Sequence, residues 1–361
     1  FSASKLQCLV NHRPELRARL ADGSALIGTV DTYLIYRLTG GKTFATDSTN
    51  ASRTLLFDIN RLGWDEELCG LWQVPVRALP EVRESSAQFG ETTLDGGLPR
   101  PVPICGVMGD SQASLFAQHC FSSGSAKVTF GTGSSVLLTI GEKIRPTTAG
   151  VLVALAWVRG GVPVYAFEGI IISSASTLNW LRDQLRLVAD IDELQKLSDE
   201  VDGAEGVHLV PAFTGLGLPH WNPLARAAIT GLSSKSDRRH IARAALESIA
   251  FQVRDVVEAM CAEADVPLAV LYADGGPTTN KFLMQFTADL VGTELRISEM
   301  PDCSALGAVF AGQLGLGFRR NLAELSARDR TILVYRPRLS RENADALYAG
   351  WKAAVRRVLT P

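Results

Sequence analysis

The order of strand-like and helical segments between residues 125 and 316 constrains the fold of this chain more than any other feature of its sequence. Three strand-like runs come first, at residues 126–130, 135–140 and 162–172. A helix (176–186), a strand (207–211) and a long amphipathic helix that Ser236 caps follow. Strands and helices then alternate to residue 316. This order predicts an α/β fold, with a mixed sheet flanked by helices on both faces, as in the ribonuclease H-like, actin-like ATPase architecture.

The length and charge of the chain limit its organisation and its partners. A chain of 361 residues is too long for one ordinary core, so we expect two domains, 1–117 and 118–361. The 36 Lys and Arg side chains nearly balance the 38 Asp and Glu side chains. A nucleic-acid groove needs a local basic excess, and the one dense basic cluster, at residues 238–240, is better explained as the start of a helix. We therefore expect no nucleic-acid partner.

Apolar runs and cysteine spacing exclude further classes. No apolar run approaches the ~20 residues that a membrane helix requires, so we expect no membrane insertion. The six cysteines are far apart and none forms a C-x-x-C pair. This spacing favours free thiols in a reducing cytoplasm over disulfides or a zinc site. The histidines are scattered, so no metal constellation of His and Cys is indicated, and no G-x-S-x-G elbow occurs, so serine-hydrolase chemistry receives little support.

One aspartate is a candidate for acid–base chemistry. The apolar run at residues 102–108 predicts a buried strand, Gly109 and Asp110 follow it, and a helix is predicted over 112–118. A carboxylate at the carboxyl end of a strand lies where α/β sheets bind ligands. Phosphoryl transfer to an alcohol needs a carboxylate that accepts the hydroxyl proton. The alternative is that Asp110 only caps the following helix, and the spacing alone leaves both interpretations open.

Two glycine-containing turns are candidates for nucleotide binding. The first, Gly131-Thr132-Gly133, joins two predicted strands, and its backbone N–H groups and hydroxyl could hold phosphate oxygens. The second, residues 274–280, joins a strand to a helix amino terminus, which is a favourable place for a phosphate or a sugar. Neither is a Walker loop or a dinucleotide fingerprint. Ordinary turns explain the glycines of both segments as well, so this alternative stays open.

Longer stretches of the sequence resemble the FGGY family of carbohydrate kinases, most closely its glycerol-phosphorylating members. The matching stretches include GTVDTYLIYRLTGG, TDSTNASRTLLFDI, GDSQASLFAQ, FGTGSSVLL, VPAFTGLGLPHWNPLARAAITGL, HIARAALESIAFQVRDVVEAM and DGGPTTNKFLMQF. They occur in the family's order through almost the whole chain. The segment 227–247 fits a family signature position by position.

The resemblance implies two actin-like domains with an active site in the cleft between them, the second domain complete and the first partial. It implies an ATP- and Mg²⁺-dependent transferase that phosphorylates a primary hydroxyl of glycerol or a similar small polyol, giving the polyol phosphate and ADP. Asp110 aligns with the catalytic base, which also lies near the Mg²⁺. The positions that align with ATP-binding residues are Gly131, Thr132, Gly133, Ala175, Asn179, Gly276, Pro277 and Asn280.

Two positions depart from the family pattern at the expected substrate site. The family usually has Gln directly after the base, where this chain has Ser111, and an aromatic residue two positions after the G-T-G loop, where it has Ser135. Both changes remove bulk and leave hydroxyl groups. We therefore hypothesise that the acceptor is longer than glycerol, such as a tetritol or a pentulose. Helix faces suggest no obvious self-association seam, and a homo-oligomer is left open.

The family also carries a segment before the equivalent of Phe1, with a Gly-Thr-rich phosphate hairpin and most of the sugar-binding residues. This segment is not part of the sequence. We expect the complete protein to contain it. The alternative is a nucleotide-binding fragment without turnover.

Overall fold

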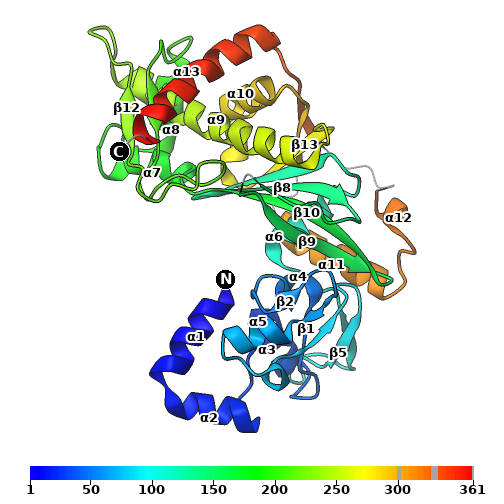
Figure 1. Cartoon of the computed structure of the whole chain (residues 1–361). Coiled ribbons are helices and arrows are strands. Elements are labelled where there is room, and N and C mark those ends of the chain that lie inside the picture. Colours follow the sequence, from blue (N-terminus) through cyan, green and yellow to red (C-terminus); the bar gives the residue numbers. More distant parts are fainter. Residues whose placement is uncertain (149, 299–301, 327–331, 360–361) are drawn as a thin grey trace.

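The computed structural model describes residues 1–148, 150–298, 302–326 and 332–359, and a seven-stranded mixed sheet forms its centre (Figure 1). The spatial order of the strands is β15, β14, β13, β7, β8, β10, β9. Their bounds are β7 (Ser125–Phe130), β8 (Ser134–Gly141), β9 (Leu152–Arg159), β10 (Val162–Ile171), β13 (Val270–Asp274), β14 (Leu295–Ser298) and β15 (Ile332–Tyr335). β7, β13 and β14 are parallel, and the remaining neighbours pair antiparallel. This is the mixed sheet predicted from the sequence.

Helices cover both faces of this sheet. In Figure 1, α9 (Arg238–Ala264), α10 (Lys281–Val291) and α13 (Arg341–Leu359) lie on one side, and α6 (Asp110–Ala117) and α11 (Cys303–Gly315) lie on the other. The remaining elements of this half are α7 (Ala175–Asp183), α8 (Ile191–Asp199), β11 (His208–Val210), β12 (Ala228–Thr230), η2 (Gly276–Thr279) and α12 (Leu322–Ser326). The three-layer arrangement agrees with the actin-like architecture expected from the order of elements.

The first 105 residues form a second body of short elements. Its helices are α1 (Ser2–His12), α2 (Pro14–Asp22), α3 (Val30–Leu38), α4 (Ser48–Ala51), α5 (Glu66–Leu71) and η1 (Val76–Ala78). Three two-stranded sheets accompany them: β1 (Ala45–Asp47) with β4 (Glu81–Arg83), β2 (Phe57–Asp58) with β3 (Gly63–Trp64), and β5 (Gln88–Thr92) with β6 (Val102–Cys105).

Polar contacts join this body to the large sheet. Arg53 forms an ion pair of 2.6 Å with Glu168 of β10. The hydroxyl of Tyr165 donates a hydrogen bond of 2.9 Å to the carbonyl of Ile59. The carboxylate of Glu84 accepts the N–H groups of residues 160 and 161, in the hairpin between β9 and β10. The two bodies therefore contact each other directly through β9, β10 and their hairpin.

The long helix α9 begins one residue later than the sequence predicted. Asp237, not Ser236, is the N-cap, and its carboxylate accepts the N–H of Arg239 at 2.9 Å. A carboxylate at this place also interacts favourably with the helix dipole, which explains the preference over the neighbouring serine. The basic cluster at residues 238–240 is the first turn of this helix, as expected.

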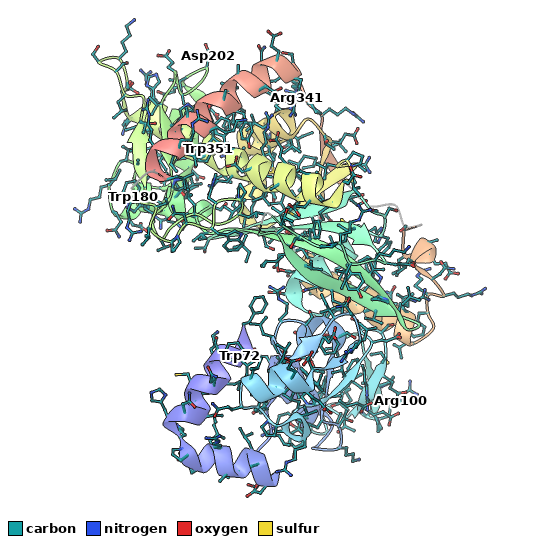
Figure 2. The ribbon with its side chains drawn as sticks, viewed as in Figure 1. Trp72, Arg100, Trp180, Asp202, Arg341 and Trp351 are labelled. Carbon is teal, nitrogen blue, oxygen red and sulfur yellow. The ribbon has the colours of Figure 1, made fainter. Side chains whose placement is uncertain are left out.

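A buried aspartate fixes the last helix onto α9. Figure 2 shows Trp351 between α13 and α9, where its ring stacks on Phe251 with centroids 5.3 Å apart. Its indole N–H donates to Asp255 at 2.7 Å, and the hydroxyl of Tyr348 donates to the same carboxylate at 2.5 Å. Burial raises the pKa of Asp255 to about 6, although both hydrogen bonds oppose the shift. The folded protein therefore holds this proton more tightly than an unfolded chain does.

Replacing Asp255 by Asn is expected to remove one pH dependence of stability. The folded carboxyl group stays protonated up to about pH 6, whereas an unfolded aspartate ionises at about pH 4. The wild-type protein should therefore gain stability as the pH falls through this window and lose it as the pH rises. The measurement is the urea midpoint of both proteins at pH 7 and pH 5. An equal change of midpoint in both proteins would contradict the assignment.

The strand predicted over residues 102–108 is present as β6, but the prediction that it is buried and reaches residue 108 is wrong. β6 ends at Cys105, pairs only with β5, and is exposed at its first two residues. A two-stranded sheet has too few neighbours to bury both faces, and an apolar sequence alone does not reveal how many neighbours a strand has. Residues 81–100, for which no strand was predicted, contain β4 and β5. β9 is a further strand not predicted from the sequence.

Membrane-spanning helices and disulfides were both expected to be absent. No helix in the described part of the chain is both long enough and apolar enough to span a bilayer. All six cysteines lie in the described part of the chain, and none of them forms a disulfide there.

Candidate active site

The two glycine-containing turns meet at one edge of the large sheet. β7 and β13 are parallel neighbours, with Asp274 opposite Thr129, so both strands end at the same edge. Gly275 follows β13 with a φ of +97°, and a Cβ atom there would lie 2.0 Å from the carbonyl oxygen of Phe130. Only glycine allows this conformation and this approach. The turn at residues 131–133 and the segment at residues 275–279 are therefore neighbours in space.

The first of these turns also receives the amino terminus of α7. The carbonyl of Gly131 accepts the N–H of Ala175 at 3.0 Å, and the carbonyl of Thr132 accepts the N–H of Ser174 at 2.9 Å. Thr132 is exposed at the tip of the turn. Asn179 follows one helical turn after Ala175 and is half-buried. The turn, the helix terminus and the 275–279 segment therefore meet at one edge of the sheet.

Asp110 is the first residue of α6. Gly109 is the N-cap of this helix, so Asp110 is not the capping residue itself. Its carboxylate is exposed and accepts the N–H of Ser111 at 2.7 Å. The other residues of α6, from Gln112 to Ala117, are buried. Asp110 therefore stands at the accessible end of an otherwise buried helix, where its carboxylate is open to a ligand.

A buried hydrogen-bond network joins α6 to the end of β13. Ser114, one turn after Asp110, donates to the carboxylate of Asp274 at 2.5 Å, and Gln118 donates to the same oxygen at 3.1 Å. Asp274 immediately precedes the Gly275 turn. The network fixes the position of the helix that carries Asp110 relative to the edge where the two glycine turns meet.

Lys127 is a site residue that the sequence reasoning missed. It lies on β7, is fully buried, and donates to Thr129 at 2.7 Å. Burial lowers the pKa of Lys127, and the nearby carboxylates of Asp274 and Asp110 oppose that shift. A charged side chain inside the apolar run 126–130 was the available signal, because a buried lysine needs a carboxylate nearby. Lys127 therefore places an amino group beneath the site, close to the carboxylates of Asp274 and Asp110.

The two serines that depart from the family pattern lie on the same side of the sheet as this network. Ser135 of β8 is opposite Thr129 of β7, and Thr129 is opposite Asp274 of β13. Residues that lie opposite each other on neighbouring strands point to the same face of the sheet, so these three side chains lie on one face. The hydroxyl of Ser135 is buried and has no hydrogen-bond partner among the described residues. Ser111 is half-buried beside Asp110.

The remaining predicted nucleotide residues occupy η2 and the start of α10. Gly276 is exposed and Pro277 is half-buried. Asn280 is the N-cap of α10, and its side-chain oxygen accepts the N–H of Leu283 at 2.8 Å. The side-chain amide nitrogen of Asn280 is consequently the group that could contact a ligand.

Two cavities lie apart from these residues. One of about 220 Å³ is lined by α1 and by residues 27–29, and one of about 510 Å³ lies between α9, α10 and α13. No predicted site residue lines either cavity. The candidate site is thus the sheet edge beside α6.

The residues at this edge fit a magnesium ion only when the phosphates of a bound nucleotide supply further ligands. No group of three or more His, Cys, Asp or Glu side chains within the described ranges could hold a metal by itself. Mg²⁺ commonly keeps several waters and is held by one or two carboxylates together with substrate phosphates. Asp110, with its exposed carboxylate, fits such a role, whereas a metal site built from protein ligands alone does not fit.

The fold and this edge define a class: an actin-like phosphotransferase, in which hydrogen bonds join a helix that begins with an exposed carboxylate to the strand end beside the two glycine turns. Comparison with known proteins specifies the family. Residues 1–117 match the model of the N-terminal domain of the FGGY family of carbohydrate kinases, and residues 126–315 match that of the C-terminal domain. The chain belongs to this family and is a carbohydrate kinase.

Individual glycerol kinases and a xylulose kinase are similar to this chain over nearly its whole length. The chain is 43% identical to the glycerol kinase of Klebsiella pneumoniae over 359 residues, which cover 99% of this chain and 71% of that protein. It is 40% identical to the glycerol kinase of Desulfitobacterium hafniense, with 99% and 73% covered. The crystal structure of Plasmodium falciparum glycerol kinase with ADP superimposes with a TM-score of 0.93 at 35% identity, over 100% of this chain and 72% of that one. A xylulose kinase from Rhodospirillum rubrum gives a TM-score of 0.83 at 26% identity, over 98% of this chain and 71% of that one.

Proposed function

We propose that this chain catalyses ATP-dependent phosphorylation of a primary hydroxyl of glycerol, giving glycerol phosphate and ADP. One structural observation carries the proposal. Hydrogen bonds from Ser114 and Gln118 to Asp274 join α6 to the edge where both glycine turns meet. Glycerol kinases at 40–43% identity over 99% of the chain support the same reaction.

In the proposed mechanism, Asp110 accepts the proton of the attacking hydroxyl as the bond to phosphorus forms. The turn at residues 131–133 holds the ATP phosphates. Residues 276, 277 and 280, together with Ala175 and Asn179, contact the adenosine. Asp110 would also be the residue that holds Mg²⁺ together with the ATP phosphates, and the bound ion would supply positive charge for the transferring phosphoryl group.

The roles divide between the two parts of the chain. We propose that residues 1–117 supply the base and that residues 118–361 bind ATP. The two family models also meet near this boundary, since one ends at residue 117 and the other begins at residue 126. We also propose that the chain acts in a reducing cytoplasm, which the wide spacing of its six cysteines favours.

The test is a coupled assay of ADP release with glycerol, erythritol, xylulose and ribulose as acceptors. Turnover with glycerol is the expected result. The absence of ADP release with every acceptor, in a protein that still binds ATP, would contradict the proposal and favour a nucleotide-binding fragment.

A second candidate acceptor, a four- or five-carbon polyol or ketose, is favoured by the two serines. The unpartnered buried hydroxyl of Ser135 could receive a hydrogen bond from an additional substrate hydroxyl.

A Ser111→Gln variant is expected to shift acceptor preference towards glycerol. The larger side chain beside Asp110 fills space that a longer acceptor would use, and one methylene in a pocket changes kcat/KM by about tenfold or more. The measurement is the ratio of kcat/KM for glycerol to that for erythritol in the variant and the wild type. The KM for ATP serves as the control and should not change. An unaltered ratio would show that residue 111 does not limit acceptor length.

A further inference from the structure

The segment TDSTNASRT, at residues 46–54, has no role in the proposed mechanism, yet five of its polar side chains are buried: Thr46, Asp47, Ser48, Thr49 and Thr54. Asp47 ends β1 and is 0% exposed. Its carboxylate accepts hydrogen bonds from the N–H and the side-chain amide of Asn50, at 2.9 and 2.7 Å, and from the hydroxyl of Ser85 at 2.7 Å. Thr49 donates to it through its N–H at 3.0 Å and its hydroxyl at 2.7 Å.

The carboxylate of Asp47 has no ion-pair partner in the described structure, so these donors alone satisfy its charge. Burial raises the pKa of Asp47 to about 6, and hydrogen bonds from Ser85, Asn50 and Thr49 oppose the shift. A buried carboxylate without a cation is costly and requires an explanation. The arrangement of its neighbours supplies one.

The hydroxyl of Thr49 connects this carboxylate to the active-site helix. It donates its only proton to Asp47 and accepts the backbone N–H of Gly109 at 2.8 Å, across 60 residues of sequence. Because the carboxylate fixes the direction of the hydroxyl proton, the lone pairs of the hydroxyl face Gly109. Gly109 is the N-cap of α6, and Asp110 is the next residue.

Further contacts hold the backbone around Asp110. The carbonyl of Ser85, whose hydroxyl donates to Asp47, accepts the N–H of Val107 at 2.9 Å. On the other side, the hydroxyl of Ser304 on α11 donates to the carbonyl of Asp110 at 2.9 Å. The backbone on both sides of the base is therefore fixed by side chains from distant segments.

We propose that Asp47 and Thr49 are positioning residues for the base Asp110, a role that rests on the phosphoryl-transfer function proposed above. Asp47 orients the hydroxyl of Thr49, which holds Gly109 and thereby sets where the carboxylate of Asp110 stands. Neither residue touches the reacting atoms. A base displaced by 1 Å loses about a hundredfold in rate, so this control of the backbone affects turnover more than binding.

The test compares two substitutions of Thr49. Thr49→Val keeps the shape and removes the hydroxyl, and it should lower kcat by about tenfold to a hundredfold while KM for ATP changes by less than about twofold. Thr49→Ser retains the hydroxyl and should stay within about threefold of the wild-type kcat. Thr54→Val is the matched control, because Thr54 is a buried threonine of the same segment whose hydroxyl bonds to Ala51 and Leu56 rather than to α6. It should leave kcat unchanged.

A double-mutant cycle separates this proposal from the proposed function. If Thr49 acts through Asp110, Thr49→Val should have no further effect on kcat in an Asp110→Asn background. A full additional loss in that background, a wild-type kcat in Thr49→Val, or an equal loss in Thr54→Val would each overturn the positioning role. Asp110→Asn with undiminished kcat would instead overturn the proposed function. If Thr49→Val does not fold, Ser304→Ala tests the same backbone from α11, and an unchanged kcat there would count against the proposal.

Discussion

Asp110→Asn is expected to lower kcat by a factor of about 10²–10⁴, the usual contribution of a positioned general base. The amide has nearly the same shape but cannot accept the proton of the attacking hydroxyl. ATP should still bind, because the proposed nucleotide contacts are in the turn at residues 131–133 and the segment at residues 275–280. The measurement is kcat from ADP release, together with ATP affinity from calorimetry.

Asp192→Asn is a suitable control for this substitution. Asp192 is likewise an exposed aspartate in the first turn of a helix, α8, so its replacement removes the same charge from a similar place. Its kcat should equal that of the wild type. If Asp110→Asn retained more than a tenth of the wild-type kcat, Asp110 would not be the base.

Gly307→Ala is expected to give the largest loss of stability, about 3 kcal/mol, at the upper end of the usual cost of overpacking. Gly307 lies on α11 where this helix crosses α6, and a Cβ atom there would lie 1.9 Å from the carbonyl oxygen of Ala113. Backbone cannot move aside as a flexible side chain can, so the two helices must separate. Because α6 carries Asp110, the same displacement should lower kcat in the fraction that folds. The measurements are the urea midpoint and kcat.

Gly70→Ala, the same substitution at an exposed glycine, is expected to increase stability instead of lowering it. Gly70 lies in α5, is exposed, and a Cβ atom there would meet nothing within 4 Å. Alanine should stabilise this helix by about 0.5 kcal/mol because it restricts the unfolded chain. Equal midpoints for Gly307→Ala and the wild type would show that the contact between α6 and α11 is not tight.

The sequence predicted the elements whose apolar residues follow one regular pattern. The strands at residues 126–130 and 135–140 are observed as β7 and β8, and the helix predicted to follow residues 274–280 is α10. β6 was predicted wrongly as a buried strand because burial depends on neighbouring strands that its own residues do not reveal. The start of α9 differed by one residue, since Ser236 and Asp237 are both good caps.

The candidate site was only partly predictable, because some of its residues act through contacts with segments that are distant in the sequence. Asp110 and the glycine turns were identifiable because each has a local motif. Lys127 was missed because its role depends on Asp274, which is close only in the folded sheet. The role proposed for Thr49 depends on a hydrogen bond to Gly109, and no local pattern in the sequence indicates such a distant contact.

A crystal structure with a non-hydrolysable ATP analogue, Mg²⁺ and glycerol would test the central claim most directly. The terminal phosphate of the analogue should lie between the turn at residues 131–133 and the carboxylate of Asp110, and a glycerol hydroxyl should lie within hydrogen-bond distance of that carboxylate. A nucleotide bound elsewhere, or a terminal phosphate turned away from Asp110, would contradict the account.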